Sequence, residues 1–215
     1  MQRFEDDIEA VFAETCDMAK LSTDMLERAI EAITDGNVEL AESIIADQDK
    51  IEKMDDDIED AAIRILTIYQ PTAVDTRTIA TILKSITHLE RIAKYSTNIA
   101  KATVYLSEKP SFPPVDLITP VGEDALNLVK LVVGGFENKS SEGFKRIPQI
   151  DDRLDSSMRE SISEIVEFIN THENSADVCT YYMSVLKFLE RVGDHACKMA
   201  EKVCFMVNGK RATIR

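Results

Sequence analysis

Apolar residues recur at alternating steps of three and four along most of the chain. The clearest stripe lies in the second half, at Tyr182, Val185, Leu189, Val192, Ala196, Met199, Val203 and Met206. A matching stripe in the first half consists of Ile82, Leu89, Ile92, Ile99 and Leu106. This spacing places side chains on one face of an α-helix, and in a helical bundle that face is buried. Both stretches are therefore predicted to be core helices.

Short turn sequences interrupt this pattern and divide it into six segments. Gly36 and Pro71 each follow a periodic stretch, and both residue types end helices. The strongest break is a group of three prolines, Pro110, Pro113 and Pro114, which splits the chain into two nearly equal halves. The sequence predicts helices over roughly 3–34, 37–69, 73–108, 115–137, 141–170 and 175–208.

The two halves share an internal repeat. Leu89-Glu90-Arg91 returns 100 residues later as Leu189-Glu190-Arg191. Such a repeat indicates two copies of one structural unit. The predicted fold is therefore all-α, with two tandem antiparallel three-helix bundles over residues 1–109 and 115–210.

Composition narrows the class of protein. Hydrophobic residues make up 44% of the chain and charged residues 30%, and the net charge is −14. Strong negative charge repels nucleic acids and anionic membrane surfaces, so direct nucleic-acid binding is not expected. No stretch approaches the ~20 consecutive apolar residues of a membrane span, and the acidic first residues do not resemble a secretory signal. The four cysteines lack the C-x-x-C spacing of a zinc knuckle or a thioredoxin-type motif, and we interpret them as reduced thiols. Together these observations predict a cytoplasmic protein without membrane insertion.

Candidate chemistry lies in two acidic pairs of the second half. Glu190 and Asp194 are four residues apart, so both project from one face of the last predicted helix. Asp151 and Asp155 form the same pair on the helix before it. If these helices are antiparallel neighbours, the four carboxylates converge into an oxygen-rich site for Mg, Ca, Mn, Fe or Zn. Because the chain carries 39 acidic residues, a purely solvated face is the alternative.

The equivalent positions of the first half carry different side chains. Glu90 keeps its acid, but Lys94 replaces the second carboxylate of that helix. On the preceding helix, Gln48 and Glu52 occupy the places of the other acidic pair. An ammonium group among carboxylates can replace a bound cation. We therefore expect an ion-pair network in the first half and metal in the second.

Other polar groups have structural interpretations. The run Asp55-Asp56-Asp57 lacks the spacing of a calcium-binding loop and is predicted to be a solvated helix face. His195 follows Asp194 but faces about 100° away around the helix, so we expect it at the surface or at a bundle edge. No Glu-x-x-His, H-E-x-x-H or G-x-S-x-G motif occurs. These observations favour a non-enzymatic protein, with a carboxylate-bridged metal enzyme and a metal-free helical adaptor as the alternatives.

Two stretches carry a resemblance to a known family. The second half contains Leu189-Glu190-Arg191-Val192-Gly193-Asp194-His195-Ala196, and the first contains Tyr69-Gln70-Pro71-Thr72 ahead of its own Leu-Glu-Arg. Both stretches resemble the PhoU family of phosphate-signalling regulators, and the resemblance covers essentially the whole chain. It implies two three-helix bundles in a cytoplasmic, dimeric, non-enzymatic adaptor. It also implies that the protein couples the ATPase of a phosphate ABC transporter to a sensor histidine kinase and represses the phosphate-starvation response.

The family's metal motif is a pair of acids separated by three residues, on the second and third helices of each half. The resemblance implies a complete set in the second half, made of Asp151, Asp155, Glu190 and Asp194. The first-half set is degenerate, because it consists of Gln48, Glu52, Glu90 and Lys94. The implied cofactor is a metal ion or multinuclear cluster, with iron or zinc ahead of Mg or Mn. Pro148 lies just before the motif and is expected to kink the fifth helix or to delay its start.

Overall fold

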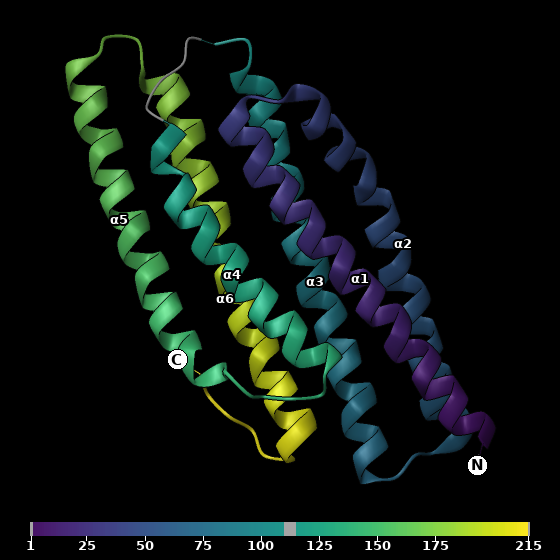
Figure 1. Cartoon of the computed structure of the whole chain (residues 1–215). Helices are drawn as coiled ribbons and strands as arrows, with labels where there is room; N and C mark the ends of the chain where they lie inside the picture. The colour runs from purple at the N-terminus through teal and green to yellow at the C-terminus, as the bar shows by residue number, and fades with distance from the viewer. Residues whose placement is uncertain (1, 110–114, 215) are drawn as a thin grey trace.

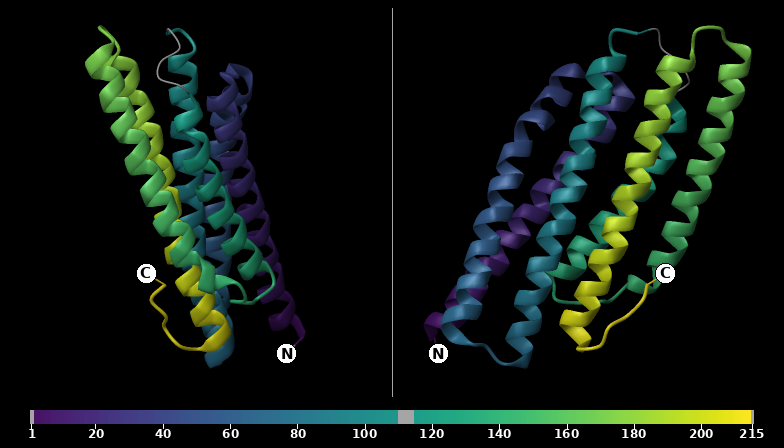
Figure 2. Two further views of the ribbon diagram at one scale, coloured as in Figure 1. Left: turned by 60° about the vertical axis from the view of Figure 1, so that its left-hand side comes forward. Right: turned by 180° about the vertical axis from the view of Figure 1, so that it is seen from behind.

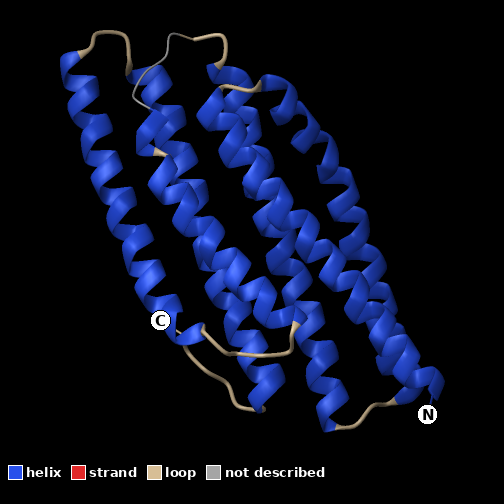
Figure 3. Ribbon diagram, in the orientation of Figure 1, coloured by secondary structure: helices blue, strands red, loops and turns tan. Residues whose placement is uncertain are grey.

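The structure, a computed structural model, describes residues 2–109 and 115–214, which are almost entirely helical (Figures 1 and 3). These residues form the helices α1 (Gln2–Asp35), α2 (Val38–Tyr69), α3 (Ala73–Leu106), α4 (Thr119–Glu137), α5 (Ile147–Thr171) and α6 (Ala176–Asn208). Two short 3₁₀ helices, η1 (Val115–Leu117) and η2 (Phe144–Arg146), precede α4 and α5. The predicted all-α fold is confirmed.

Helix ends follow from local residue types. Gly36 has a φ of 65°, in the left-handed region that terminates α1. Asn37 then begins α2, because its side chain accepts a hydrogen bond from the backbone N–H of Leu40 at 3.0 Å. Gly209 ends α6 in the same way as Gly36, with a φ of 67°. The three prolines that were predicted to divide the chain, residues 110, 113 and 114, lie outside the described residues.

Two helices begin later than the sequence predicts. The fourth helix was expected from 115 but starts at Thr119, because η1 precedes it. The fifth was expected from 141 but starts at Ile147, after η2. Pro148 lies in the first turn of α5, where a missing backbone N–H removes no helical hydrogen bond. Of the two effects expected of this proline, the structure shows the delayed start.

The third helices of the two halves, α3 and α6, run antiparallel through the middle of the molecule (Figure 2). Thr81 contacts Lys202 near one end of this pair, and Tyr105 stacks on Tyr181 near the other. α1 packs on α3, α4 packs on α6, and α1 also contacts α4. α2 covers one side of this central group and α5 the other (Figure 1). Each half is thus a three-helix bundle whose third helix faces that of the other half.

One continuous hydrophobic core joins the two halves. Leu89 and Leu189, which occupy the same place in the repeat, are both fully buried. The whole stripe predicted for the last helix is buried, and in the first-half stripe only Leu106 is partly exposed. Because both halves contribute to this one core, it does not mark where one bundle ends and the other begins. The predicted bundle limits, at residues 109 and 115, therefore stay a prediction. Within the described parts of the chain, no helix combines the length and the apolar character that crossing a membrane requires.

Candidate metal centre

Asp151 lies in the first turns of α5 and is buried against α6. The residue is 7% exposed, and its Oδ1 atom accepts a weak hydrogen bond from the Cys197 thiol at 3.5 Å. Gly193 makes this approach of α5 to α6 close. A Cβ atom at Gly193 would lie 3.1 Å from Leu154 Cδ1 and 3.9 Å from Asp151 Oδ1. The glycine therefore lets Leu154 of α5 pack closely on α6, next to Asp151.

The other predicted ligands lie nearby on the same two helices. Asp194 directly follows Gly193 and is half-buried, as is Asp155 on α5. The side chain of Glu190 is 17% exposed and lies one turn before Asp194, with its Oε2 atom 3.0 Å from Lys187 Nζ. That oxygen is buried and forms an ion pair with the Lys187 ammonium, and it has no hydrogen-bond partner among the described residues.

These side chains do not form a gathered ligand set. Across residues 2–109 and 115–214, no three or more His, Cys, Asp or Glu side chains lie close enough together to hold a metal ion. The donor chemistry nevertheless suits a hard cation, because it consists of carboxylate oxygens and includes the buried Oε2 of Glu190. Metal binding in the second half therefore stays a prediction.

Three of the four residues in the degenerate first-half set, Gln48, Glu52 and Lys94, form a chain of polar contacts. Gln48 is 7% exposed, and its Oε1 atom accepts a hydrogen bond from Thr97 Oγ1 at 2.9 Å. Its Nε2 group donates to Glu52 Oε1 at 2.8 Å, and Lys94 Nζ lies 3.8 Å from the same oxygen. Glu90 does not join this chain but pairs with Arg91, whose Nε atom is 3.3 Å from Glu90 Oε2. The ammonium of Lys94 thus contacts one of the two carboxylates between which it was expected.

The acidic run of α2 is only partly solvated. Asp56 and Asp57 are exposed, as predicted, but Asp55 is half-buried in a hollow that it shares with Glu90. Asp55 Oδ1 is buried without a hydrogen-bond partner among the described residues. Burial raises the pKa of the Asp55 carboxyl, and the charges of Glu90, Glu59 and Asp56 raise it further. The solvated-face prediction is therefore wrong for Asp55.

His88 and His195 meet between α3 and α6, with their Nδ1 atoms 3.1 Å apart. Burial, followed by the charges of His195 and nearby lysines, lowers the pKa of His88 to about 4. Burial also lowers the pKa of His195. Both rings are therefore neutral near pH 7, and one Nδ1–H can donate to the other Nδ1. The bundle-edge position expected for His195 is the contact between the two halves.

Sequence reasoning missed the partners of the buried polar residues. The thiol beside Asp151 and the hydroxyl beside Gln48 belong to Cys197 and Thr97, which occupy the same place in the repeat. The 100-residue offset that aligns Glu90 with Glu190 also aligns these two residues, so it could have identified them as a pair. The contact between His88 and His195 has no comparable local signal, because 107 residues separate them.

The fold and this site define a class: duplicated three-helix bundles in which the second and third helices carry polar residues that face each other. A sequence model of the PhoU domain matches residues 15–103 and 118–203, one match in each half. The chain belongs to the PhoU family, as its resemblance predicted.

Relatives and solved structures agree with this assignment over nearly the whole chain. The phosphate-specific transport system accessory protein PhoU homologue of Zymomonas mobilis is 28% identical over 211 residues, covering 98% of this chain and 89% of that protein. PhoU homologue 1 of Thermotoga maritima is 30% identical over 208 residues, covering 96% and 90%. The crystal structure of PhoU from Pseudomonas aeruginosa matches with a TM-score of 0.92 at 26% identity, covering 96% of this chain and 100% of that one.

Proposed function

We propose that this protein is an accessory regulator of phosphate-specific transport that acts by protein–protein contact. The observation that carries the proposal is the PhoU-domain match in both halves, together with relatives that span nearly the whole chain and are named as accessory proteins of that transport system. The proposed partners are the ATPase of a phosphate ABC transporter and, where the host has one, a sensor histidine kinase. The proposed output is repression of the phosphate-starvation response by a cytoplasmic homodimer, without catalysis.

The molecular surface is suited to such contacts. Long helices expose extended faces, and with a net charge of −14 these faces favour basic partner surfaces. Exposed apolar side chains near the junction of α2 and α3, Ile63, Ile68 and Val74, offer hydrophobic contacts beside the acidic ones. The proposal therefore places recognition on helix faces rather than in a catalytic cleft.

Affinity purification tests this function. The tagged full-length chain would be recovered from phosphate-replete cells of its host, and from cells starved of phosphate, with bound proteins identified by mass spectrometry. We expect the transporter ATPase and the kinase in the replete sample. Loss of the gene should raise expression from a phosphate-starvation promoter under replete conditions. Recovery of neither partner, with an unchanged promoter, would contradict the proposal.

Metal binding is the second part of the proposal. The ligands would be Asp151, Asp155, Glu190 and Asp194, and the cation would be iron or zinc, with Mg or Mn as further candidates. A cation there would neutralise carboxylates from both α5 and α6. Because it would bind the folded arrangement only, it would stabilise the contact between these helices by mass action.

Elemental analysis separates the metal-bound and metal-free forms of the regulator. Untagged protein would be purified without chelator and compared with Glu190→Ala/Asp194→Ala. The matched control is Glu52→Ala/Glu90→Ala, which removes the same number of carboxylates from the first half. Metal that is lost only in the second-half variant would support the proposed site. Equal metal content in all three proteins, or none after reconstitution, would contradict it and leave a metal-free adaptor.

A further inference from the structure

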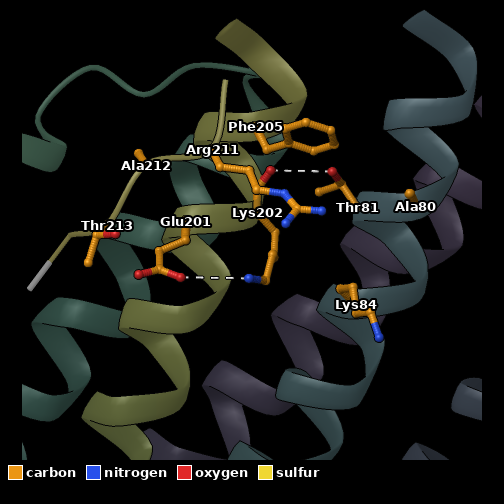
Figure 4. Close-up of a pocket in the computed structure, with 9 residues that line it drawn as sticks. All are labelled: Ala80, Thr81, Lys84, Glu201, Lys202, Phe205, Arg211, Ala212 and Thr213. Carbon is orange, nitrogen blue, oxygen red and sulfur yellow. Dashed lines mark hydrogen bonds and ion pairs between the residues drawn. The ribbon is translucent and has the colours of Figure 1, made fainter. Parts of the chain in front are cut away.

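A pocket of about 480 Å³ lies between α3, α6 and the segment that follows α6 (Figure 4). It is separate from the predicted metal centre and from the hollow beside Asp55. Thr81 and Lys84 line it from α3, Lys202 and Phe205 from α6, and Arg211 from the segment after α6. Arg211 reaches from this returning segment toward α3 (Figure 4).

The pocket is held in shape by contacts among its walls. Thr81 Oγ1 donates to the backbone carbonyl of Lys202 at 3.3 Å, which ties α3 to α6. Gly209 turns the chain back after α6, and the backbone N–H of Ile214 donates to Glu201 Oε1 at 3.4 Å. Ile214 also packs on the hydrophobic core. The segment that carries Arg211 is therefore anchored at both ends.

The charge of this pocket is opposite to that of the whole protein. Three cationic side chains line it, Lys84, Lys202 and Arg211, against one carboxylate, Glu201. The chain as a whole has a net charge of −14. Glu201 is partly neutralised, because its Oε2 atom lies 3.6 Å from Lys202 Nζ. An anion that enters the pocket would therefore meet an excess of positive charge.

The lysines of this pocket also act on a neighbouring histidine. The pKa of His88, one turn along α3 from Lys84, is lowered first by burial and then by the charges of His195, Lys202, Lys198 and Lys84. Positive charge from both helices therefore converges on this part of the α3–α6 contact.

The repeat-related positions at the other end of the α3–α6 pair do not form a second pocket of this kind. The positions that correspond to Thr81 and Phe205 at the opposite end of the α3–α6 pair are Tyr181 and Tyr105. Those two tyrosine rings stack with their centroids 3.9 Å apart. The equivalent space is thus filled by aromatic side chains at one end and left open, with cationic walls, at the other.

Size and lining indicate the class of ligand. Pockets for small organic ligands measure about 300–1,000 Å³, and a volume of about 480 Å³ falls in this range. It is much larger than one tetrahedral anion requires. The half-buried Phe205 ring supplies an apolar wall beside the cationic groups. Arginine and lysine are the side chains that proteins use to bind phosphate groups.

We propose that this pocket binds a phosphorylated organic anion of nucleotide size, with its phosphates at Lys202, Arg211 and Lys84 and its planar apolar part against Phe205. This site is additional to the proposed regulatory function and does not depend on it. Binding would fasten the segment after α6 to α3, because Arg211 and Lys84 would share one ligand.

Calorimetric titration of the full chain, in phosphate-free buffer at low salt, tests this inference. The probes are ADP, pyrophosphate, orthophosphate and adenosine. We expect saturable one-to-one binding of ADP that weakens as salt is added, and binding of orthophosphate and adenosine at least about tenfold weaker. Failure of ADP to bind saturably would overturn the proposal. Orthophosphate binding as tightly as ADP would overturn its organic part.

Variants locate the binding. Arg211→Gln and Lys202→Gln should each weaken ADP binding about tenfold, the loss expected for one charge-assisted hydrogen bond. Phe205→Leu should weaken ADP but leave pyrophosphate unchanged. Lys101→Gln is the matched control, because it removes an exposed lysine from the other end of α3. An equal loss in this control would overturn the assignment. Arg211 lies outside the helices, so its variant keeps the test valid if Lys202→Gln impairs folding.

Discussion

The two halves place a buried polar residue at the same point between their second and third helices, and the two residues differ in charge. Gln48 in the first half and Asp151 in the second are each 7% exposed. Each accepts a hydrogen bond from a side chain on the third helix of its own half. Thr97 donates to Gln48 and Cys197 donates to Asp151, and these two donors occupy the same position in the repeat. An amide can also donate, and Gln48 does so to Glu52, whereas a carboxylate cannot. At this position the first half therefore holds an amide that both accepts and donates within its own side chains, and the second half holds a buried carboxylate.

The neighbouring positions extend this difference. Lys94 brings a positive charge to the first half, where the second half has Asp194. Ala93 is likewise replaced by Gly193, which lets Leu154 approach α6 closely. The four positions of the first half carry one net negative charge, and those of the second carry four. One fold thus supports a polar network with little net charge in one copy and an excess of carboxylate in the other.

The largest predicted effect is on unfolding free energy and comes from the hydrophobic core that the two halves share. Leu89→Ala and Leu189→Ala each empty a fully buried position of the shared core. Each should cost about 2–5 kcal/mol of unfolding free energy, measured by urea denaturation. Because the core is continuous, both variants should unfold in a single transition. Two separate transitions, with only one shifted in each variant, would show instead that the halves unfold independently.

Exchanging the buried polar residues tests the comparison directly. Gln48→Glu buries a carboxylate beside Glu52 and removes the Nε2 donor, so it should lower the unfolding free energy by about 1–3 kcal/mol. Asp151→Asn keeps an acceptor for the Cys197 thiol, so it should cost less unfolding free energy in metal-free buffer than Gln48→Glu. Urea denaturation of both variants measures the difference. Equal destabilisation by the two substitutions would show that the two halves do not differ in whether they need an amide or a carboxylate at this buried position.

The contact between the halves should make stability depend on pH. The pKa of folded His88 is lowered to about 4 from the ordinary value of 6.5, so below pH 6.5 the unfolded chain binds a proton that the folded chain does not. The contribution of neutral His88 to the unfolding free energy is therefore fully present above pH 6.5 and is lost as the pH falls toward 4. Allowing for partial exposure, the loss between pH 7 and pH 5 should be about 1 kcal/mol.

His88→Gln should remove that part of the pH dependence, as measured by urea denaturation at several pH values. The groups whose charges act on His88 are His195, Lys202, Lys198 and Lys84, and all of them stay in place in this variant. His172→Gln, an exposed position at the end of α5, is the matched control. A pH profile that is the same in His88→Gln and wild type would contradict the assignment.

The helices and their buried faces could be predicted because core contacts repeat along the chain, as the stripe from Tyr182 to Met206 shows. The start of α5 could not. It depends on how the segment before α5 packs on α4, where a Cβ atom at Gly135 would lie 2.4 Å from the Phe144 ring. Local periodicity carries no information about a contact of this kind.

The same limit applies to the site. The i, i+4 spacing predicted that Glu190 and Asp194 share a face of one helix, and the repeat predicted which first-half positions differ. The partners of the buried groups, by contrast, come from packing between distant segments. Cys197 beside Asp151 and His88 beside His195 are contacts of tertiary structure, which no helical spacing encodes.

The smallest effect on stability is expected at Lys94. Its side chain is 41% exposed and its ammonium lies 3.8 Å from Glu52 Oε1, so Lys94→Asp should change the unfolding free energy by less than about 1 kcal/mol. The Lys94→Asp substitution is most informative when it is combined with Gln48→Asp. Gln48→Asp/Lys94→Asp gives the first half the same acid pattern as the second, and elemental analysis would measure metal per chain. If the acid pattern is what binds metal, the double variant should carry more metal than wild type. If metal content stays the same while the second half binds it, the acid pattern alone is not sufficient, and the remaining differences include Gly193 in place of Ala93 and Cys197 in place of Thr97.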